Sequence, residues 1–98
     1  MNIKEVKQIV SDAIMTTAGI VGFEELIESE INIKNNNGLV VEYDSNNENI
    51  INVTIGLLIL SNISAKNTVE EIYQNITHFL KKESLFLGSL SVYIKGTK

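Results

Sequence analysis

Residues 50–60 carry the longest apolar pattern of the chain and predict its central strand. Apolar residues first occupy alternate positions, which is the period of a β-strand with one buried face. From Leu58 onward the second side also becomes apolar, at Leu58 and Leu60, as in a strand that is covered on both faces. The run is far shorter than the ~20 residues that a transmembrane helix requires. The residues that share the first side are Ile51, Val53, Ile55, Leu57 and Ile59.

Two stretches show the three-and-four spacing of apolar residues that is typical of an amphipathic helix. The first covers residues 3–17, and Gly19 is a natural stop signal behind it. The second covers residues 69–82, where Asn67 is the expected N-cap and Glu70 has the spacing of a capping box. We therefore expect one helix near the start of the chain and one between the central strand and the last strand.

Residues 39–44 and 89–96 alternate between apolar and polar side chains and predict two further strands. The polar residues 45–49 predict a hairpin connection longer than two residues. A strand–helix–strand crossover should be right-handed and parallel. The pattern predicts an α+β fold, a single α-β-β-α-β domain over residues 1–98. Its three-stranded mixed sheet has the order 1-2-3, with two helices packed on one face.

The segment 20–34 is expected to be a covering loop with a short helix near residues 24–29. The two predicted helices leave one face of the sheet uncovered, and this face includes apolar side chains. Either the loop or another chain should bury them, because exposed apolar patches mark interaction sites. The expected protein-binding residues are Val40, Leu58, Leu60, Ile20, Val21 and Phe23.

Composition narrows the classes of function. The formal net charge of -4 argues against nucleic-acid binding, which needs a basic face. The chain has no cysteine, so a thiol nucleophile and a thiolate zinc site are excluded. Residues 1–19 do not form a signal peptide, because charged residues interrupt their apolar positions, and a cytoplasmic protein is expected. Arginine, proline and tryptophan are absent while Ile, Asn and Lys are frequent, which indicates a genome of low GC content.

No set of residues predicts catalysis, a metal site or a cofactor site. His78 is the only histidine and lies off the apolar stripe of its helix, so we expect an exposed residue without a catalytic role. The carboxylates Glu24, Glu25, Glu28 and Glu30 lack the alternating ligand pattern of a calcium loop and are expected to be solvated. The chain is therefore not expected to be an enzyme.

A Gly-x-x-Gly sequence at Gly19–Gly22 leaves an alternative function open. In KH-like domains such a loop clamps the nucleic-acid backbone. Here the glycines enclose apolar residues, and two glutamates follow, so a packed apolar turn is the favoured interpretation. A KH-like RNA- or ribosome-binding module remains the alternative to a protein-binding domain.

Three stretches together resemble a known family. They are the first helix running into Thr17-Ala18-Gly19-Ile20-Val21-Gly22-Phe23, the hairpin with a long apolar second strand, and the second helix followed by a strand that ends at Gly96. This arrangement resembles the alkaline shock protein family of low-GC Gram-positive bacteria. Ser61 and Asn62 stand where that family has Tyr-Gly, and the last strand is rich in serine instead of valine.

The resemblance implies a small non-enzymatic protein linked to stress response and homeostasis of the cell envelope. Separately from the resemblance, the uncovered sheet face predicts self-association or a protein partner, the net charge argues against nucleic acid, and no direct insertion into the membrane is expected. The resemblance also implies a cytoplasmic location, with indirect membrane association through an anchor protein. No catalytic residues are attributed to this family, so the resemblance adds none here.

Overall fold

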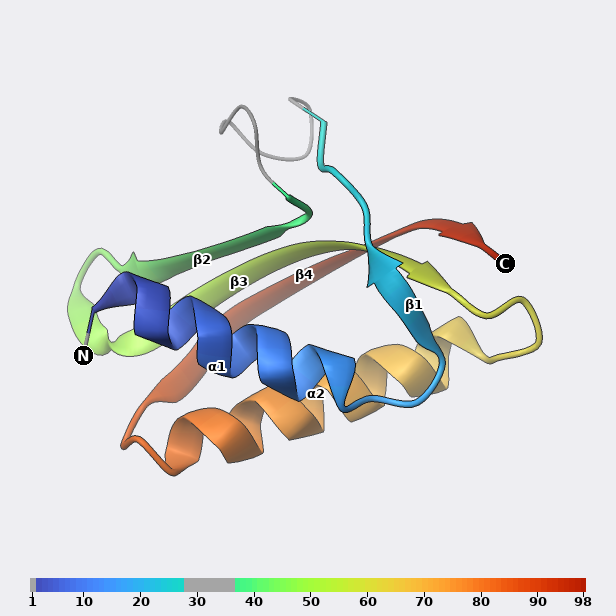
Figure 1. The fold of residues 1–98 in the computed structure, drawn as a ribbon. Helices are drawn as coiled ribbons and strands as arrows, with labels where there is room; N and C mark the ends of the chain where they lie inside the picture. The colour runs from blue at the N-terminus through green and yellow to red at the C-terminus, as the bar shows by residue number, and fades with distance from the viewer. Residues whose placement is uncertain (1, 28–36) are drawn as a thin grey trace.

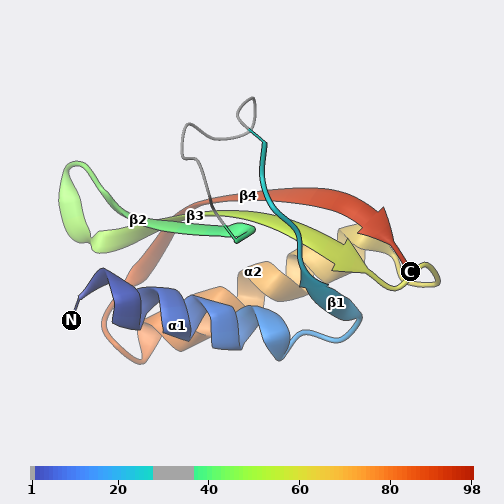
Figure 2. The same cartoon turned by 45° about the horizontal axis from the view of Figure 1, so that its top comes forward.

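The computed structural model describes residues 2–27 and 37–98, which form an α+β fold (Figure 1). Both helices lie on the same face of the sheet, as Figure 2 shows. The α+β class and the packing of both helices on one face were predicted from the sequence pattern. The elements are α1 Ile3–Met15, β1 Ile20–Phe23, β2 Leu39–Asp44, β3 Asn47–Ile59, α2 Ala65–Lys81 and β4 Phe86–Thr97.

The sheet contains four strands, so the prediction of a three-stranded sheet is wrong. Residues 20–23, expected as part of a loop, form β1 and pair antiparallel with the end of β3. The predicted strands keep their predicted neighbours, because β3 pairs antiparallel with β2 on one side and parallel with β4 on the other. The sheet is therefore mixed, with β3 at its centre.

β1 and β2 form one edge of the sheet that is interrupted at Gly56. The Gly56 N–H donates to the Gly38 carbonyl (2.8 Å), and the Gly56 carbonyl accepts from the Glu24 N–H (2.9 Å). In an uninterrupted antiparallel ladder, one partner residue would make both bonds. Glu24 and Gly38 therefore share the two bonds of Gly56, and the ladder along β3 has no gap between β1 and β2. Gly38 has φ +84°, a conformation that favours glycine.

The core lies between the sheet and the two helices. The alternating positions of β3 from Ile51 to Ile59 are all buried on this side, as the sequence predicts. α1 contributes Val6, Val10 and other residues of its apolar stripe, and Gly19 follows it with φ +86°. α2 contributes its own stripe, which consists of Ile72, Ile76 and Leu80.

The helix and hairpin ends correct two predictions. α2 begins at Ala65 and its N-cap is Ser64, whose side chain accepts from the N–H of Asn67, so Asn67 is not the cap. The hairpin between β2 and β3 has the two-residue turn 45–46, since Asp44 pairs with Asn47. A register shift beside this pair accommodates residues that the sequence assigned to a longer loop.

One part-buried polar contact joins α2 to the turn that follows α1. The Asn75 amide Nδ2 of α2 donates to the Thr17 hydroxyl behind α1 (2.9 Å). Thr17 is buried, and its hydroxyl also donates to the Ala13 carbonyl (3.3 Å). A buried polar group is costly without a partner, so this pair fixes how α1 sits against α2.

Candidate functional site

The face of the sheet that points away from the helices is called here the outer face. Asn52 and Thr54 on β3 make its first half polar, and Gly56 and Leu58 continue it towards the end of the strand. Leu26 and Val40 are buried but lie outside the main core. A β-carbon at Gly56 would meet the Glu24 carbonyl oxygen and the Leu26 side chain, so the chain after β1 crosses the outer face there.

The segment after β1 thus covers the middle of the outer face. It does so without the helix that the sequence predicted at residues 24–29, because residues 24–27 are not helical. The remainder of that predicted helix lies outside the described residues, as do Glu28 and Glu30 of the acidic group. Close passage of the Glu24 backbone over the sheet requires glycine at position 56.

Leu58 marks the part of the outer face that this segment leaves open. β1 shifts register between Ile20 and Gly22, and β4 shifts between its partners of Leu57 and Leu58. Each neighbouring strand therefore inserts one residue beside Leu58, and such bulges bend a sheet. The residues directly opposite Leu58 are Gly22 and Gly96, so no side chain flanks it in the same row.

Two exposed apolar residues lie beside Leu58. Val21, the residue inserted in β1, is 37% exposed, and Leu60 is 43% exposed. The Leu60 N–H donates to the Gly19 carbonyl (3.0 Å), which holds this residue beside the start of β1. Val21, Leu58 and Leu60 together are called the outer patch.

The six residues predicted for protein binding do not form one surface. Ile20 and Phe23 are partly buried and pack against the core, so they lie on the helix side of the sheet. Val40 is buried at 8% exposure. Only the three residues of the outer patch lie together at the open end of the sheet. The period-two pattern assigned Leu58 to the side of β3 that faces away from the helices, as the structure has it. No pattern in residues 20–23 indicated a strand with two faces.

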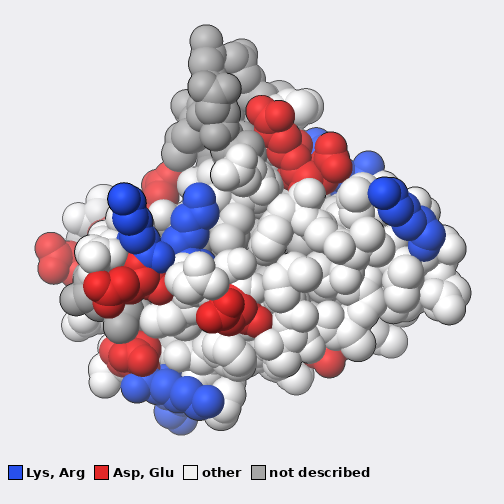
Figure 3. Space-filling model, in the orientation of Figure 1, with Lys and Arg blue, Asp and Glu red and all other residues white. Residues whose placement is uncertain are grey.

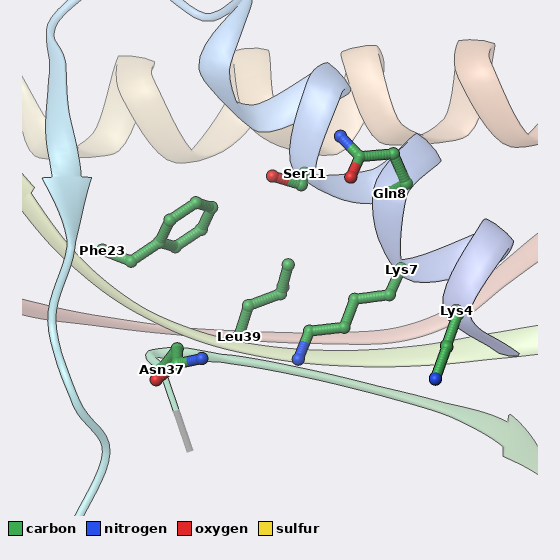
Figure 4. A pocket seen from close by; sticks show the side chains of 7 residues that line it. All are labelled: Lys4, Lys7, Gln8, Ser11, Phe23, Asn37 and Leu39. Atoms are coloured by element: carbon green, nitrogen blue, oxygen red, sulfur yellow. The ribbon is translucent and has the colours of Figure 1, made fainter. Parts of the chain in front are cut away.

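A crevice of about 240 Å³ lies between α1 and the interrupted edge of the sheet (Figure 4). Figure 4 shows Lys4 and Lys7 extending from α1 towards β2, with Lys7 nearer the start of the strand, while Phe23 and Leu39 supply apolar walls. Among the residues that the structure describes, no carboxylate lines the crevice. Its chemistry suits an anionic group attached to an apolar one. The remaining lining residues are Gln8, Ser11 and Asn37.

The Gly-x-x-Gly sequence does not form the loop that the RNA-binding alternative needs. Gly19 lies in a turn, and the residues that follow it form β1. β1 pairs antiparallel with the end of β3, so Gly22 lies in a strand and not in a loop. Figure 3 shows lysines interspersed with carboxylates in this view, without a continuous basic face. The structure therefore does not contain the Gly-x-x-Gly loop on which the KH-like alternative was based.

His78 is exposed on α2, as predicted, and its ring stacks edge-on against Phe79 with 6.3 Å between centroids. Within residues 2–27 and 37–98, no group of three or more His, Cys, Asp or Glu side chains is close enough to hold a metal ion. In the same part of the chain, no helix is both long and apolar enough to cross a membrane.

A groove between α2 and β4 was not anticipated from the sequence. It has a volume of about 450 Å³ and lies beside the free edge of the sheet. Tyr73 is 52% exposed here, although it lies in the stretch 69–82 whose apolar residues have helical spacing. The sequence analysis did place the strand at residues 89–96, now β4, at the edge of the sheet. That position was the one indication that a surface lies open beside it. The lining residues are Val69, Glu70, Tyr73, Gln74 and Leu90.

Comparisons with known proteins identify the fold alone. No family model and no curated protein matches the sequence. Among solved structures, a copper form of a MamM CTD variant is 12% identical, with a TM-score of 0.59 over 99% of this chain and 100% of that one. A nickel form of another variant gives 12% identity and a TM-score of 0.58 over 98% and 100%. Helices on one face of a mixed sheet are thus a fold that this chain shares with the MamM CTD.

Proposed function

We propose that this protein is a non-catalytic domain that associates with a protein through the outer patch. The observation that carries the proposal is the open end of the outer face, where Leu60 and Val21 are exposed beside Leu58. In the middle of this face the chain covers itself, since Leu26 and Val40 are buried. An apolar surface left open beside one that is covered is typical of an interaction site.

The proposed class is a relative of the alkaline shock proteins, with a role in homeostasis of the cell envelope. The support is the resemblance in the first helix and turn, the hairpin and the last strand. The partner is a protein or another copy of the chain, and a protein anchor would supply any contact with the membrane. His78 is exposed and lines neither the crevice beside α1 nor the groove between α2 and β4, which supports a non-catalytic role.

The test is a quantitative pull-down from native lysate of the source organism with three versions of the protein as bait. Leu60→Asp places a charge in the outer patch, whereas Ile3→Asp places the same charge at an exposed apolar residue on α1. We expect the wild type and Ile3→Asp to retain the same proteins and Leu60→Asp to lose them. Equal recovery with all three baits, or no specific recovery by the wild type, would contradict the proposal.

A further inference from the structure

The crevice beside α1 collects positive charge at the start of the helix. Lys4 and Lys7 lie about one turn apart on the flank of α1 that lines it. Two like charges at this spacing repel each other and destabilise a helix. Lys4 also lies in the first turn, where the partial positive charge of the helix N-terminus favours acidic residues instead. This arrangement is unfavourable for the helix alone and favourable for a bound anion.

The carboxylates of α1 do not balance this charge. Glu5 accepts from the side-chain amide of Asn2 (3.0 Å), and Asp12 accepts from that of Gln8 (2.8 Å). Neither carboxylate lines the crevice. Within residues 2–27 and 37–98, neither lysine of the crevice forms an ion pair or a hydrogen bond. The acceptors that both ammonium groups need must therefore come from water or from a ligand.

Apolar surface adjoins the charged end of the crevice. Figure 4 shows Phe23 at the end opposite Lys4, with Leu39 between them. Leu39 is buried, and Phe23 packs partly against the core, so both walls are held in place by the fold. The volume of about 240 Å³ lies just below the range of roughly 300–1,000 Å³ that holds drug-sized ligands. The crevice therefore suits a small molecule with one anionic end and one apolar end.

We propose that the crevice binds a small organic phosphate, with the phosphate at the two lysines and the apolar part against Phe23 and Leu39. A phosphate monoester carries about 1.5 to 2 negative charges at pH 7, which matches two ammonium groups better than a single carboxylate does. Charge-assisted hydrogen bonds from the lysines would hold it. The Ser11 hydroxyl also lines the crevice and can donate to the same group.

The proposed site joins three elements at the interrupted edge of the sheet. The lysines belong to α1, Phe23 is the last residue of β1, and Leu39 is the first residue of β2. A ligand in contact with all three would hold the two strand ends against the helix. The inference goes beyond the proposed association with a protein, because the crevice lies on the helix side of the sheet and the outer patch on the other face.

The test is a titration of the 98-residue chain followed by its amide chemical shifts in NMR, at neutral pH and low salt. The probe is phenyl phosphate, and it is compared with inorganic phosphate, phenol and benzoate. Each of these three lacks the apolar part, the anionic part or the second charge. We expect phenyl phosphate to bind about tenfold tighter than any of them, with shifts centred on residues 4–11, 23 and 37–39.

Two charge variants and a matched control locate the site. Lys4→Gln and Lys7→Gln each remove one ammonium group and should weaken binding of phenyl phosphate about tenfold, the effect of one charge-assisted hydrogen bond. Lys66→Gln is the control, because Lys66 is the second residue of α2 as Lys4 is of α1, and it does not line the crevice. All three lysines are exposed, so each variant should fold. The control should bind as the wild type does.

Vesicles distinguish a free phosphate compound from the head group of a lipid. Phosphatidic acid presents a phosphate monoester at a membrane surface, and phosphatidylcholine vesicles provide the background. Sedimentation with phosphatidic acid that Lys7→Gln weakens and Lys66→Gln does not would assign the phosphate to a lipid. Binding of phenyl phosphate without such sedimentation would assign it to a free compound. Both results support a phosphate site in the crevice.

Absence of saturable shifts with phenyl phosphate would overturn the inference. Inorganic phosphate or benzoate that binds as tightly as phenyl phosphate would also overturn it, because the apolar walls or the second charge would then contribute nothing. Equal weakening by Lys66→Gln would show that the probe responds only to net charge. None of these outcomes bears on the outer patch, whose partner is tested by Leu60→Asp.

Discussion

The two faces of the sheet use the same strand in opposite ways. On the helix side, Ile51, Ile55 and Ile59 are almost completely buried in one core. On the outer face, the residues between them change from polar to glycine to leucine along β3. The first face is closed by the fold itself, whereas the second is closed only where the Glu24–Leu26 segment crosses it.

This difference predicts that stability and association are separable properties of neighbouring residues. A substitution on the helix side should lower the stability of the fold without directly changing the surface that contacts a partner. A substitution at the open end of the outer face should alter contacts and leave folding nearly unchanged. The following changes test that separation, from the largest expected loss of stability to the smallest.

Ile55→Ala should have the largest effect. Ile55 is fully buried at the centre of the core, and truncation leaves a cavity that the surrounding side chains fill only in part. We expect the free energy of unfolding to fall by about 2–5 kcal/mol. Urea denaturation followed by circular dichroism measures this loss, and a loss below ~1 kcal/mol would show that the helix side is not the closed face.

Gly56→Ala tests the crossing over the outer face. The added β-carbon would collide with the Glu24 carbonyl oxygen, so backbone must shift. We expect a loss of roughly 1–3 kcal/mol, the range for forced overpacking. Gly22→Ala is the matched control, because its β-carbon would have no neighbour within 4 Å. Similar losses at both positions would mean that the segment after β1 does not rest on Gly56.

Thr17→Val tests the polar link inside the helix layer. The variant keeps the shape of the side chain but removes the acceptor of the Asn75 amide. We expect a loss of about 1 kcal/mol in urea denaturation. Thr16→Val removes an exposed hydroxyl that donates to Asp12 and should change stability by less than ~0.5 kcal/mol. Equal effects would remove the distinction between buried and exposed hydroxyls.

Leu60→Asp should have the smallest effect on stability. Its side chain is substantially exposed at the end of β3, so a carboxylate there stays in water. We expect a change within about 0.5 kcal/mol in the free energy of unfolding. A loss comparable with that of Ile55→Ala would show that the outer patch is part of the core and not a surface for a partner.

The sequence predicted the helix side more completely than the outer face. Three-and-four and alternating patterns identify which residues are buried together, and they located α1, α2, β2, β3 and β4. β1 was missed because its four residues include a bulge and a glycine, so no alternation is visible. Strand pairing at Gly56 depends on two segments that are distant in sequence, and local pattern does not report such contacts.

The residues of the candidate site were likewise predicted where a local pattern reports them and missed where it does not. Leu58 and Leu60 were identified because they break the alternation of the central strand. Ile20 and Phe23 were assigned to the same surface because a loop has no defined sides, whereas β1 turns them towards the core. The groove beside Tyr73 required knowledge of where α2 lies relative to β4, which helical periodicity alone does not provide.

The most direct test of an open, contact-forming end of the outer face is photo-crosslinking in living cells. A photoreactive amino acid replaces Leu60 in one version of the protein and Ser45, in the hairpin turn, in another. The account predicts covalent protein adducts from position 60 and none from position 45. Absence of adducts at position 60, or the same adducts at both positions, would contradict it.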